Sequence, residues 1–117
     1  MRVAGANGKV IIEDAKIASD FFSRFFGMIC VDSKKGPFAM WFPHCSSIHM
    51  LFMRFSLDLI FLNRQKQVVK IVYSAKPWTP VIMSFRAESV LEIIPGNWDR
   101  EQLRVGDYLV FDESNKP

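Results

Sequence analysis

Apolar residues recur along most of the chain in short runs, and each run has its own spacing of polar positions. β-Branched and aromatic residues dominate runs of four to eight residues, which glycine, proline, asparagine or charged residues separate. This pattern is typical of strands joined by brief turns. We therefore expect strands at "KVIIED" (9–14), "FAMWF" (38–42), "IHMLFMRF" (48–55), "LDLIFLN" (57–63), "VVKIVYS" (68–74), "ESVLEII" (88–94) and "YLVF" (108–111).

Two other segments follow a helical pattern. In "IASDFFSRFFGM" (17–28) the apolar residues recur at spacings of three and four, so this segment predicts one amphipathic helix that ends near Gly27. The segment "PGNWDREQLRVGD" (95–107) predicts a helix of one or two turns, with Asn97 as its N-cap. Asp99 and Glu101 then fall in the first turn, where the helix dipole favours acidic residues.

The order of these elements predicts the fold class. Strands follow one another with brief connections, and only one helix is long enough to cross a sheet, so repeated βαβ units are not expected. We predict a mainly β fold, a compact antiparallel β-sandwich or barrel of about seven strands with one or two short helices. With 117 residues the chain predicts a single domain, 1–117, in which 112–117 form a loose tail.

Composition and charge exclude some classes of protein. The formal charge of +3 comes from basic residues scattered without a dense block, so we expect no nucleic-acid partner. No apolar run approaches the roughly 20 residues of a membrane span, and the start of the chain does not resemble a signal peptide. We therefore predict a cytoplasmic protein in which Cys30 and Cys45 are reduced thiols.

The segment "HCSSIHMLFMRFSLD" (44–58) concentrates polar side chains in apolar surroundings. One interpretation is structural: Arg54 and Asp58 form a buried pair that fixes a strand corner. A metal site of His44, Cys45 and His49 is another, because imidazole and thiolate suit zinc or copper. The spacing of these three residues is poor and no fourth ligand is apparent, so we expect no metal and no cofactor.

Two further interpretations give the same segment a function. Cys45 could act as a nucleophile with His49 or His44 as its base, since an adjacent imidazolium favours the reactive thiolate. Alternatively, polar groups could orient a ligand in a mostly apolar cleft. Cys45, Ser47, His49 and Asp58 would provide those groups, and Met53, Trp41 and Trp78 would form the walls.

The segments "SIHMLFMRFSLDLIFLN", "VLEIIPG" and "LRVGDYLVF" resemble a known family over most of the chain. The chain is similar to domain-of-unknown-function family 192, and within it to a subgroup with a Cys-x-Ser-Ile-His motif. Met50 follows that motif where the subgroup usually has threonine. The resemblance implies a compact, mostly antiparallel β fold with no established activity, and it marks as residues of interest Cys45, Ser47, His49, Met53, Asp58 and Glu92.

Three functions stay open after these arguments. The leading hypothesis is a non-enzymatic module that binds a small molecule or peptide near Cys45, His49, Met53 and Asp58. The resemblance suggests the first alternative, a protein-interaction accessory of a secretion or pilus-assembly apparatus, with exposed Phe and Met side chains as its contact surface. The second alternative is a thiol-dependent enzyme that uses Cys45 and His49. Nothing in the sequence indicates the oligomeric state.

Overall fold

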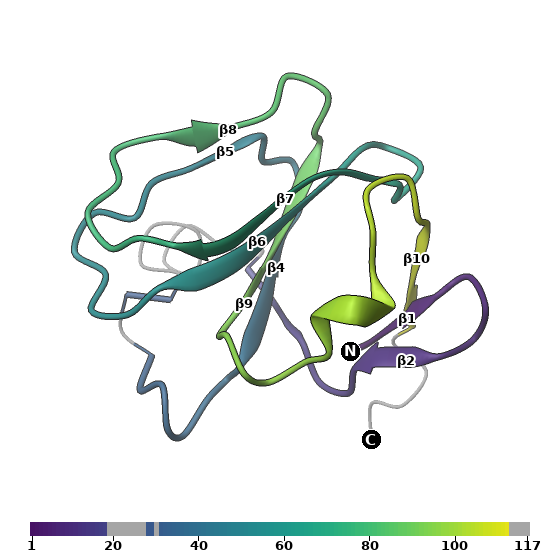
Figure 1. Ribbon diagram of the computed structural model, residues 1–117, viewed down its shortest axis with the longest axis horizontal. Helices are drawn as coiled ribbons and strands as arrows, with labels where there is room; N and C mark the ends of the chain where they lie inside the picture. The colour runs from purple at the N-terminus through teal and green to yellow at the C-terminus, as the bar shows by residue number, and fades with distance from the viewer. Residues whose placement is uncertain (19–27, 30, 113–117) are drawn as a thin grey trace.

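Three open β-sheets form the framework of the computed structural model, which describes residues 1–18, 28, 29 and 31–112 (Figure 1). Within those residues the mainly β prediction is confirmed, and the helical content is a single 3₁₀ turn, η1 (Arg100–Gln102). The strands are β1 (Arg2–Gly5), β2 (Val10–Ile12), β3 (Lys16–Ile17), β4 (Ala39–Phe42), β5 (Ser47–Ile48), β6 (Leu57–Leu62), β7 (Val68–Ala75), β8 (Ile82–Met83), β9 (Ser89–Ile93) and β10 (Leu109–Asp112).

The central sheet has the strand order β3-β4-β9-β6-β7. Its strands pair antiparallel except for β3 and β4, which are parallel. Every residue of β6 and β9 is buried, because apolar layers cover both faces of the sheet. This explains why these two strands read as nearly continuous apolar runs rather than as an alternation of apolar and polar residues.

The second sheet, with the order β10-β1-β2, packs on one face of the central sheet. Val3 and Ile12 from the second sheet share an apolar core with Ile60, Leu91 and Ile93 from the central sheet. Side chains of two sheets that fill one core make a β-sandwich arrangement. The barrel alternative is not supported, because none of the sheets formed by the described residues closes on itself.

The other face of the central sheet lies under irregular chain. Met28, Val31, Met50 and Met53 pack there against a core that includes Leu59. The predicted strand 48–55 is therefore wrong beyond its first residue: only Ser47–Ile48 form a strand, which pairs with β8. The chain then turns, and the Met53 N–H donates to the Met50 carbonyl at 3.2 Å. Ile48, Met50 and Met53 are each buried, at spacings that fold the segment onto the core instead of extending it.

The other strand predictions are confirmed, with shifts of one or two residues at their ends, by β2, β4, β6, β7, β9 and β10. The short strands β1, β3 and β8 were not predicted. The apolar pattern did not separate them from loops, because β3 and β8 have two residues each and β1 contains alanine and glycine.

The two helix predictions agree with the structure only in small part. Ile17, the expected first helical residue, lies in β3 and pairs with Trp41, whereas residues 19–27 lie outside the described part of the chain. The helix expected within 95–107 shrinks to η1, and Asp99 rather than Asn97 caps it. Asp112, expected in a loose tail, pairs with Arg2 in the second sheet, and the rest of that tail lies outside the described residues. No helix in the described segments is long and apolar enough to cross a membrane.

Candidate functional site

The side chain of Asp58 makes several hydrogen bonds to described residues around the central sheet. It lies in β6, is fully buried, and accepts four hydrogen bonds. One carboxylate oxygen, Oδ1, accepts from the backbone N–H of Ser74 at 2.8 Å and from Nη2 of Arg100 at 2.7 Å. The other, Oδ2, accepts from Nε1 of Trp98 at 2.7 Å and from Nε of Arg100 at 3.0 Å. This paired arrangement satisfies a charge that would otherwise be costly to bury.

The partner of Asp58 differs from the one expected. Arg54 was predicted to pair with Asp58, but its Nη2 donates to the carbonyl of Val31 at 3.0 Å. The cation that pairs with Asp58 is Arg100, which stands 42 residues away in the sequence. The fold brings β6 under η1, and a partner chosen by closeness in sequence was therefore wrong.

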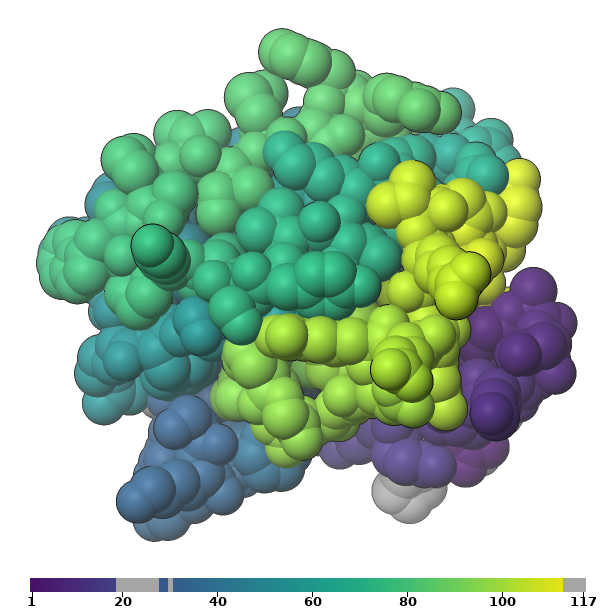
Figure 2. Space-filling model, viewed as in Figure 1, coloured from purple at the N-terminus to yellow at the C-terminus, as the bar shows by residue number. Residues whose placement is uncertain are grey.

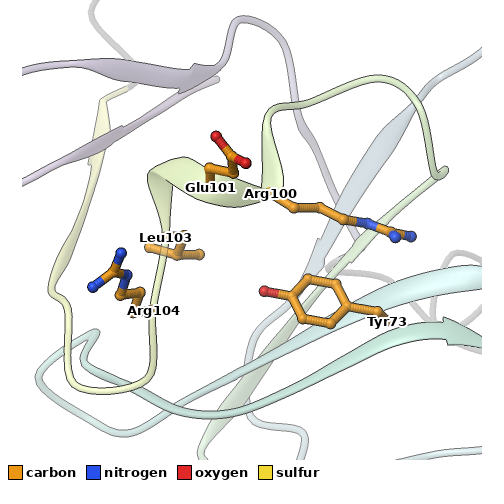
Figure 3. A pocket seen from close by; sticks show the side chains of 5 residues that line it. All are labelled: Tyr73, Arg100, Glu101, Leu103 and Arg104. Carbon is orange, nitrogen blue, oxygen red and sulfur yellow. The ribbon is translucent and has the colours of Figure 1, made fainter.

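The Asp58 contact fixes the guanidinium of Arg100 at the wall of an open cleft. The cleft has a volume of about 780 Å³ and is lined by Tyr73, Arg100, Glu101, Leu103 and Arg104 (Figure 3). Arg100 also donates to Oγ of Ser74 at 2.9 Å and lies 4.9 Å from the ring centre of Tyr73. Hydrogen bonding to Asp58 raises the pKa of Arg100 further above its usual value, so the guanidinium stays charged.

The turn that forms the other wall is specified locally. The carboxylate of Asp99 accepts from the backbone N–H of Glu101 at 2.9 Å, which caps η1. Leu103 follows η1 and is buried in the core between the two sheets. The backbone N–H of Arg104 donates to Asp107 at 2.9 Å. A cap, an apolar anchor and a turn thus hold the residues that line the cleft.

The close-up in Figure 3 shows how these side chains are directed. The Tyr73 hydroxyl points toward the side of the cleft where Leu103 lies, whereas the Glu101 carboxylate points away from the tyrosine ring. The guanidinium groups of Arg100 and Arg104 lie on opposite sides of Tyr73 in this view. The lining of the cleft thus offers an aromatic surface, one guanidinium held in place by Asp58 at one end, and a second guanidinium from Arg104 at the other. Chemically, this set can receive a flat or apolar group together with an anionic group.

The residues of the Cys-x-Ser-Ile-His segment lie elsewhere, near β5 and β8. The Cys45 thiol is partly buried against the core and donates to the carbonyl of Ser47 at 3.0 Å. Ser47 and His49 are exposed, and Nδ1 of His49 accepts from the backbone N–H of Leu51 at 3.3 Å. His44 is exposed at the start of this segment, 3.7 Å from Glu88. The described residues contain no group of three His, Cys, Asp or Glu side chains that could hold a metal ion.

Met53 and Glu92 belong to the face of the central sheet opposite Asp58. Met53 is buried in the core that includes Leu59, and Glu92 lies directly across from Leu59 in the pairing of β6 with β9. Burial raises the pKa of Glu92 to about 8. The six residues marked by the sequence thus occupy two sheet faces and the exposed β5 segment, and they do not converge on one cleft.

Sequence reasoning missed the residues that line the cleft. Tyr73 was one apolar position within a strand, and Arg100 was one position of a short helix. No local pattern links β6 to η1, because their contact depends on the packing of two distant segments. One sequence signal could have indicated these residues. The run Trp98-Asp99-Arg100 places an aromatic N–H donor and a guanidinium beside a residue that can cap a helix, and both donors could pair with a buried carboxylate.

Comparison with known proteins identifies relatives along nearly the whole chain. A "UPF0127 protein" from Thermococcus sibiricus is 32% identical over 113 residues, which cover 93% of this chain and 73% of the relative. A second, from Pyrococcus furiosus, is 32% identical over 108 residues, which cover 87% of this chain and 90% of the relative.

A crystal structure of a protein of unknown function from Novosphingobium aromaticivorans matches with a TM-score of 0.70. The match covers 94% of this chain and 82% of that one, at 22% identity, so it shows the likeness of the fold alone. The sequence model of the family DUF192, described as "Uncharacterized ACR", matches residues 2–111. The chain therefore belongs to the DUF192 family.

Proposed function

We propose that the chain is a non-enzymatic binding module whose cleft beside η1 receives a small organic molecule with one carboxylate next to an aromatic or apolar part. The observation that carries this proposal is the fixing of Arg100 at the cleft wall by the fully buried Asp58. Asp58 acts here as a positioning residue, since it touches Arg100 and not the ligand.

The size and lining of the cleft support a small ligand. Pockets that bind small molecules typically measure about 300–1,000 Å³ and combine apolar walls with a few fixed polar groups. The volume of about 780 Å³ falls in that range. Tyr73 supplies most of the apolar contact, since Leu103 is almost fully buried, and the tyrosine hydroxyl adds a group that can donate or accept a hydrogen bond.

The state of Arg100 supports recognition of a carboxylate. Its Nε and Nη2 atoms already bond to Asp58 and Ser74, and its side chain remains 41% exposed. No described residue accepts a hydrogen bond from Nη1, so its N–H groups are open to a ligand oxygen. Because the guanidinium is already held on several sides, binding a ligand costs little further side-chain entropy.

The charges around the cleft balance one another. Asp58 compensates Arg100, and Glu101 lies on the same wall as the second cation, Arg104. The attraction for a ligand carboxylate therefore comes from the open N–H groups of Arg100 and not from a net positive charge, and a second carboxylate would meet Glu101, which already offsets Arg104. A monocarboxylate should therefore bind better than a dicarboxylate of similar size.

Nuclear magnetic resonance titration of the ¹⁵N-labelled chain with indole-3-acetate tests the proposal. We expect saturable shifts of the Trp98 Nε1–H signal and of the backbone amides of Tyr73 and residues 100–104, with a Kd of about 1 mM for a fragment of this size. Indole-3-acetamide has the same shape without the charge and should bind several-fold more weakly.

Two variants and one control locate the binding. Arg104→Gln and Tyr73→Leu should each weaken indole-3-acetate binding about fivefold or more, because both side chains line the cleft. Arg64→Gln removes an exposed cation that pairs with Glu88 outside the cleft, and it should leave the affinity unchanged. Equal affinity for the acid and the amide, or equal affinity in all three variants, would reject the cleft as the site.

The sequence-based ligand contacts of Cys45, Ser47, His49, Met53 and Glu92 stay predictions, and so does the cytoplasmic location. The same titration tests these contacts, since a ligand there would shift the amides of residues 45–53 rather than those of 100–104. The thiol-dependent alternative has its own test. If Cys45 is activated, iodoacetamide should modify it much faster than a simple thiol at neutral pH.

A further inference from the structure

The chain outside the cleft carries an exposed apolar surface on one lobe, which we define as residues 44–56 and 76–87. This lobe contains the paired strands β5 and β8 and the loops on either side of them. Large apolar side chains stand out from it into solvent: Phe52, Trp78, Val81, Met83 and Phe85. Exposed apolar surface of this kind can mark an interaction site.

The apolar side chains of the lobe point away from the core. Ile82 of β8 packs against the core, and its two neighbours in the chain, Val81 and Met83, are exposed. Phe85 is 93% exposed and therefore touches almost nothing of its own chain. Such side chains protrude, whereas side chains that line a groove contact their neighbours and are partly covered.

Two of the protruding aromatic residues are held in an uncommon backbone conformation. Phe52 has φ of 66° and Trp78 has φ of 71°, a region that bulky residues rarely adopt. Their rings meet edge to face, with centroids 5.1 Å apart. Backbone hydrogen bonds brace the two loops: Trp78 donates to Met50 at 2.7 Å and Met50 donates to Thr79 at 2.8 Å. Strained conformations of this kind concentrate at functional sites.

Charge is divided along the chain in a way that favours an anionic partner for the lobe. Residues 33–87 contain eight Lys and Arg residues and one acidic residue, the buried Asp58, for a formal charge of +7. The rest of the chain has a formal charge of −4. The lobe itself contains Arg54, Lys76 and Arg86 and no acidic residue.

The lobe occupies one side of the molecule. Figure 2 shows the chain around residues 76–88, in green, along the upper and left edge, whereas the purple strands β1 and β2 lie at the lower right. Residues 1–17, which include β1 and β2, contain three basic and two acidic residues, whereas the lobe contains basic residues and no acidic one. A single orientation can therefore present the lobe to a surface and keep β1 and β2 away from it.

We propose that this lobe docks on a membrane surface that carries anionic lipid headgroups. Phe52, Trp78 and Phe85 enter the interfacial layer, while Lys76 and Arg86 contact the headgroups. A lipid surface fits better than a protein partner because protruding side chains need no matching pocket in a bilayer. Tryptophan suits this position, since its ring is apolar and its N–H group can bond to headgroups or water.

Co-sedimentation with lipid vesicles tests the proposal with the whole chain. We would compare vesicles of phosphatidylcholine alone with vesicles that contain about 30% phosphatidylglycerol, at about 0.05 M and 0.3 M salt. The expected result is partition at least tenfold stronger on the anionic vesicles, weakened by the higher salt. The fluorescence of the bound protein should shift to shorter wavelength, and this shift should disappear in Trp78→Phe.

Matched variants separate the lobe from general charge and apolarity. Phe85→Ser should weaken partition about tenfold, because burial of a phenyl ring in the interface is lost. The pair Lys76→Glu and Arg86→Glu should weaken it by at least another tenfold. Val105→Ser with Val110→Ser removes apolar side chains that are 61% and 52% exposed outside the lobe, and Lys9→Glu with Lys16→Glu reverses two charges there. Both control pairs should retain binding.

Each outcome decides the proposal. Loss of partition in the lobe variants alone, with unchanged melting temperatures, supports it. No binding to anionic vesicles at low salt overturns it, and so does equal loss in the lobe and control variants. Sedimentation equilibrium that shows a dimer abolished by Phe85→Ser would also overturn it, because a second copy of the chain would then cover the lobe. The cleft shares no residue with the lobe, so either proposal can fail without the other.

Discussion

Two buried carboxyl groups, Asp58 and Glu92, lie on neighbouring strands of the central sheet and face opposite sides of it. In the pairing of β6 with β9, Glu92 is across from Leu59 and Asp58 is across from Ile93. Leu59 packs in one core and Ile93 in the other, which places the two carboxyl groups in different layers. Asp58 is fully buried and Glu92 is 5% exposed, so both have been withdrawn from water to nearly the same extent.

The two groups differ in what replaces the lost water. Four hydrogen bonds and the charge of Arg100 compensate Asp58. No described residue donates a hydrogen bond to the Glu92 carboxyl, and burial raises its pKa to about 8. The comparison indicates that hydrogen-bond donors and a cation compensate the buried carboxyl group of Asp58, whereas burial of Glu92 without such partners raises its pKa. The surroundings of a carboxyl group in this sheet therefore matter as much as its burial.

Removing the charge of Asp58 should have the largest effect on stability. We expect Asp58→Asn to lower the free energy of unfolding by about 3 kcal/mol or more at pH 7, because Arg100 would lose its counter-charge and the new amide N–H groups would face donors. Urea denaturation measures the change. Glu13→Gln, which alters an exposed pair 3.5 Å from Arg2, should change stability by less than about 0.5 kcal/mol. A loss below about 1 kcal/mol in Asp58→Asn would contradict this account.

Glu92 should make stability fall as the pH rises. Its folded pKa of about 8 lies above its usual value of 4.5, so the folded chain binds more protons between those limits and stability is lost as the pH rises through that window. Between pH 5 and pH 7 the loss from this group is about 3 kcal/mol. Urea titrations of the chain and of Glu92→Gln at both pH values measure it, and the difference between the two proteins should grow with pH. A constant difference would show that Glu92 is already charged.

The sequence predicted the strands that carry long β-branched or aromatic runs. The strands β6, β7 and β9 were located to within two residues, because burial on one or both faces leaves a clear apolar signature. The segment 48–55 has the same composition but turns onto the core instead. Composition cannot separate these outcomes, since a buried irregular segment and a buried strand both select apolar residues.

The candidate site was less accessible to sequence reasoning. Asp58 was recognised as a residue of interest, yet its partner Arg100 is 42 positions away and was missed. The predicted pairing with Arg54 used sequence distance, whereas the observed pairing depends on the turn after β9 that returns η1 to the start of β6, where Asp58 lies. Which distant residues form a charge pair depends on the order and connection of the strands, and the sequence defined the strand order least well.

Trp98 offers a way to remove one of the four donors while keeping the charge pair. Trp98→Phe deletes the N–H that donates to Oδ2 of Asp58 at 2.7 Å and retains most of the apolar ring. We expect a loss of about 1.5 kcal/mol, since one hydrogen bond to a buried charged group disappears. Trp41→Phe is the control, because its Nε1 is buried and bonds to no described residue. A larger loss in the Trp41 variant would mean that ring packing, rather than the donor, explains the result.

Ser74→Ala should have the smallest effect and tests whether Asp58 alone fixes Arg100. The Ser74 Oγ accepts from Nη2 of Arg100 at 2.9 Å on the exposed side of the pair, where water can replace it. We therefore expect a loss of about 0.5 kcal/mol in urea denaturation, with the backbone N–H of Ser74 still bonded to Asp58. The affinity for indole-3-acetate should also stay within about twofold. A loss as large as that of Trp98→Phe would show that the Ser74 hydroxyl also helps to stabilise the buried pair of Asp58 and Arg100. The contrast between Asp58 and Glu92 would then depend on the whole polar cluster and not only on the donors that reach Asp58.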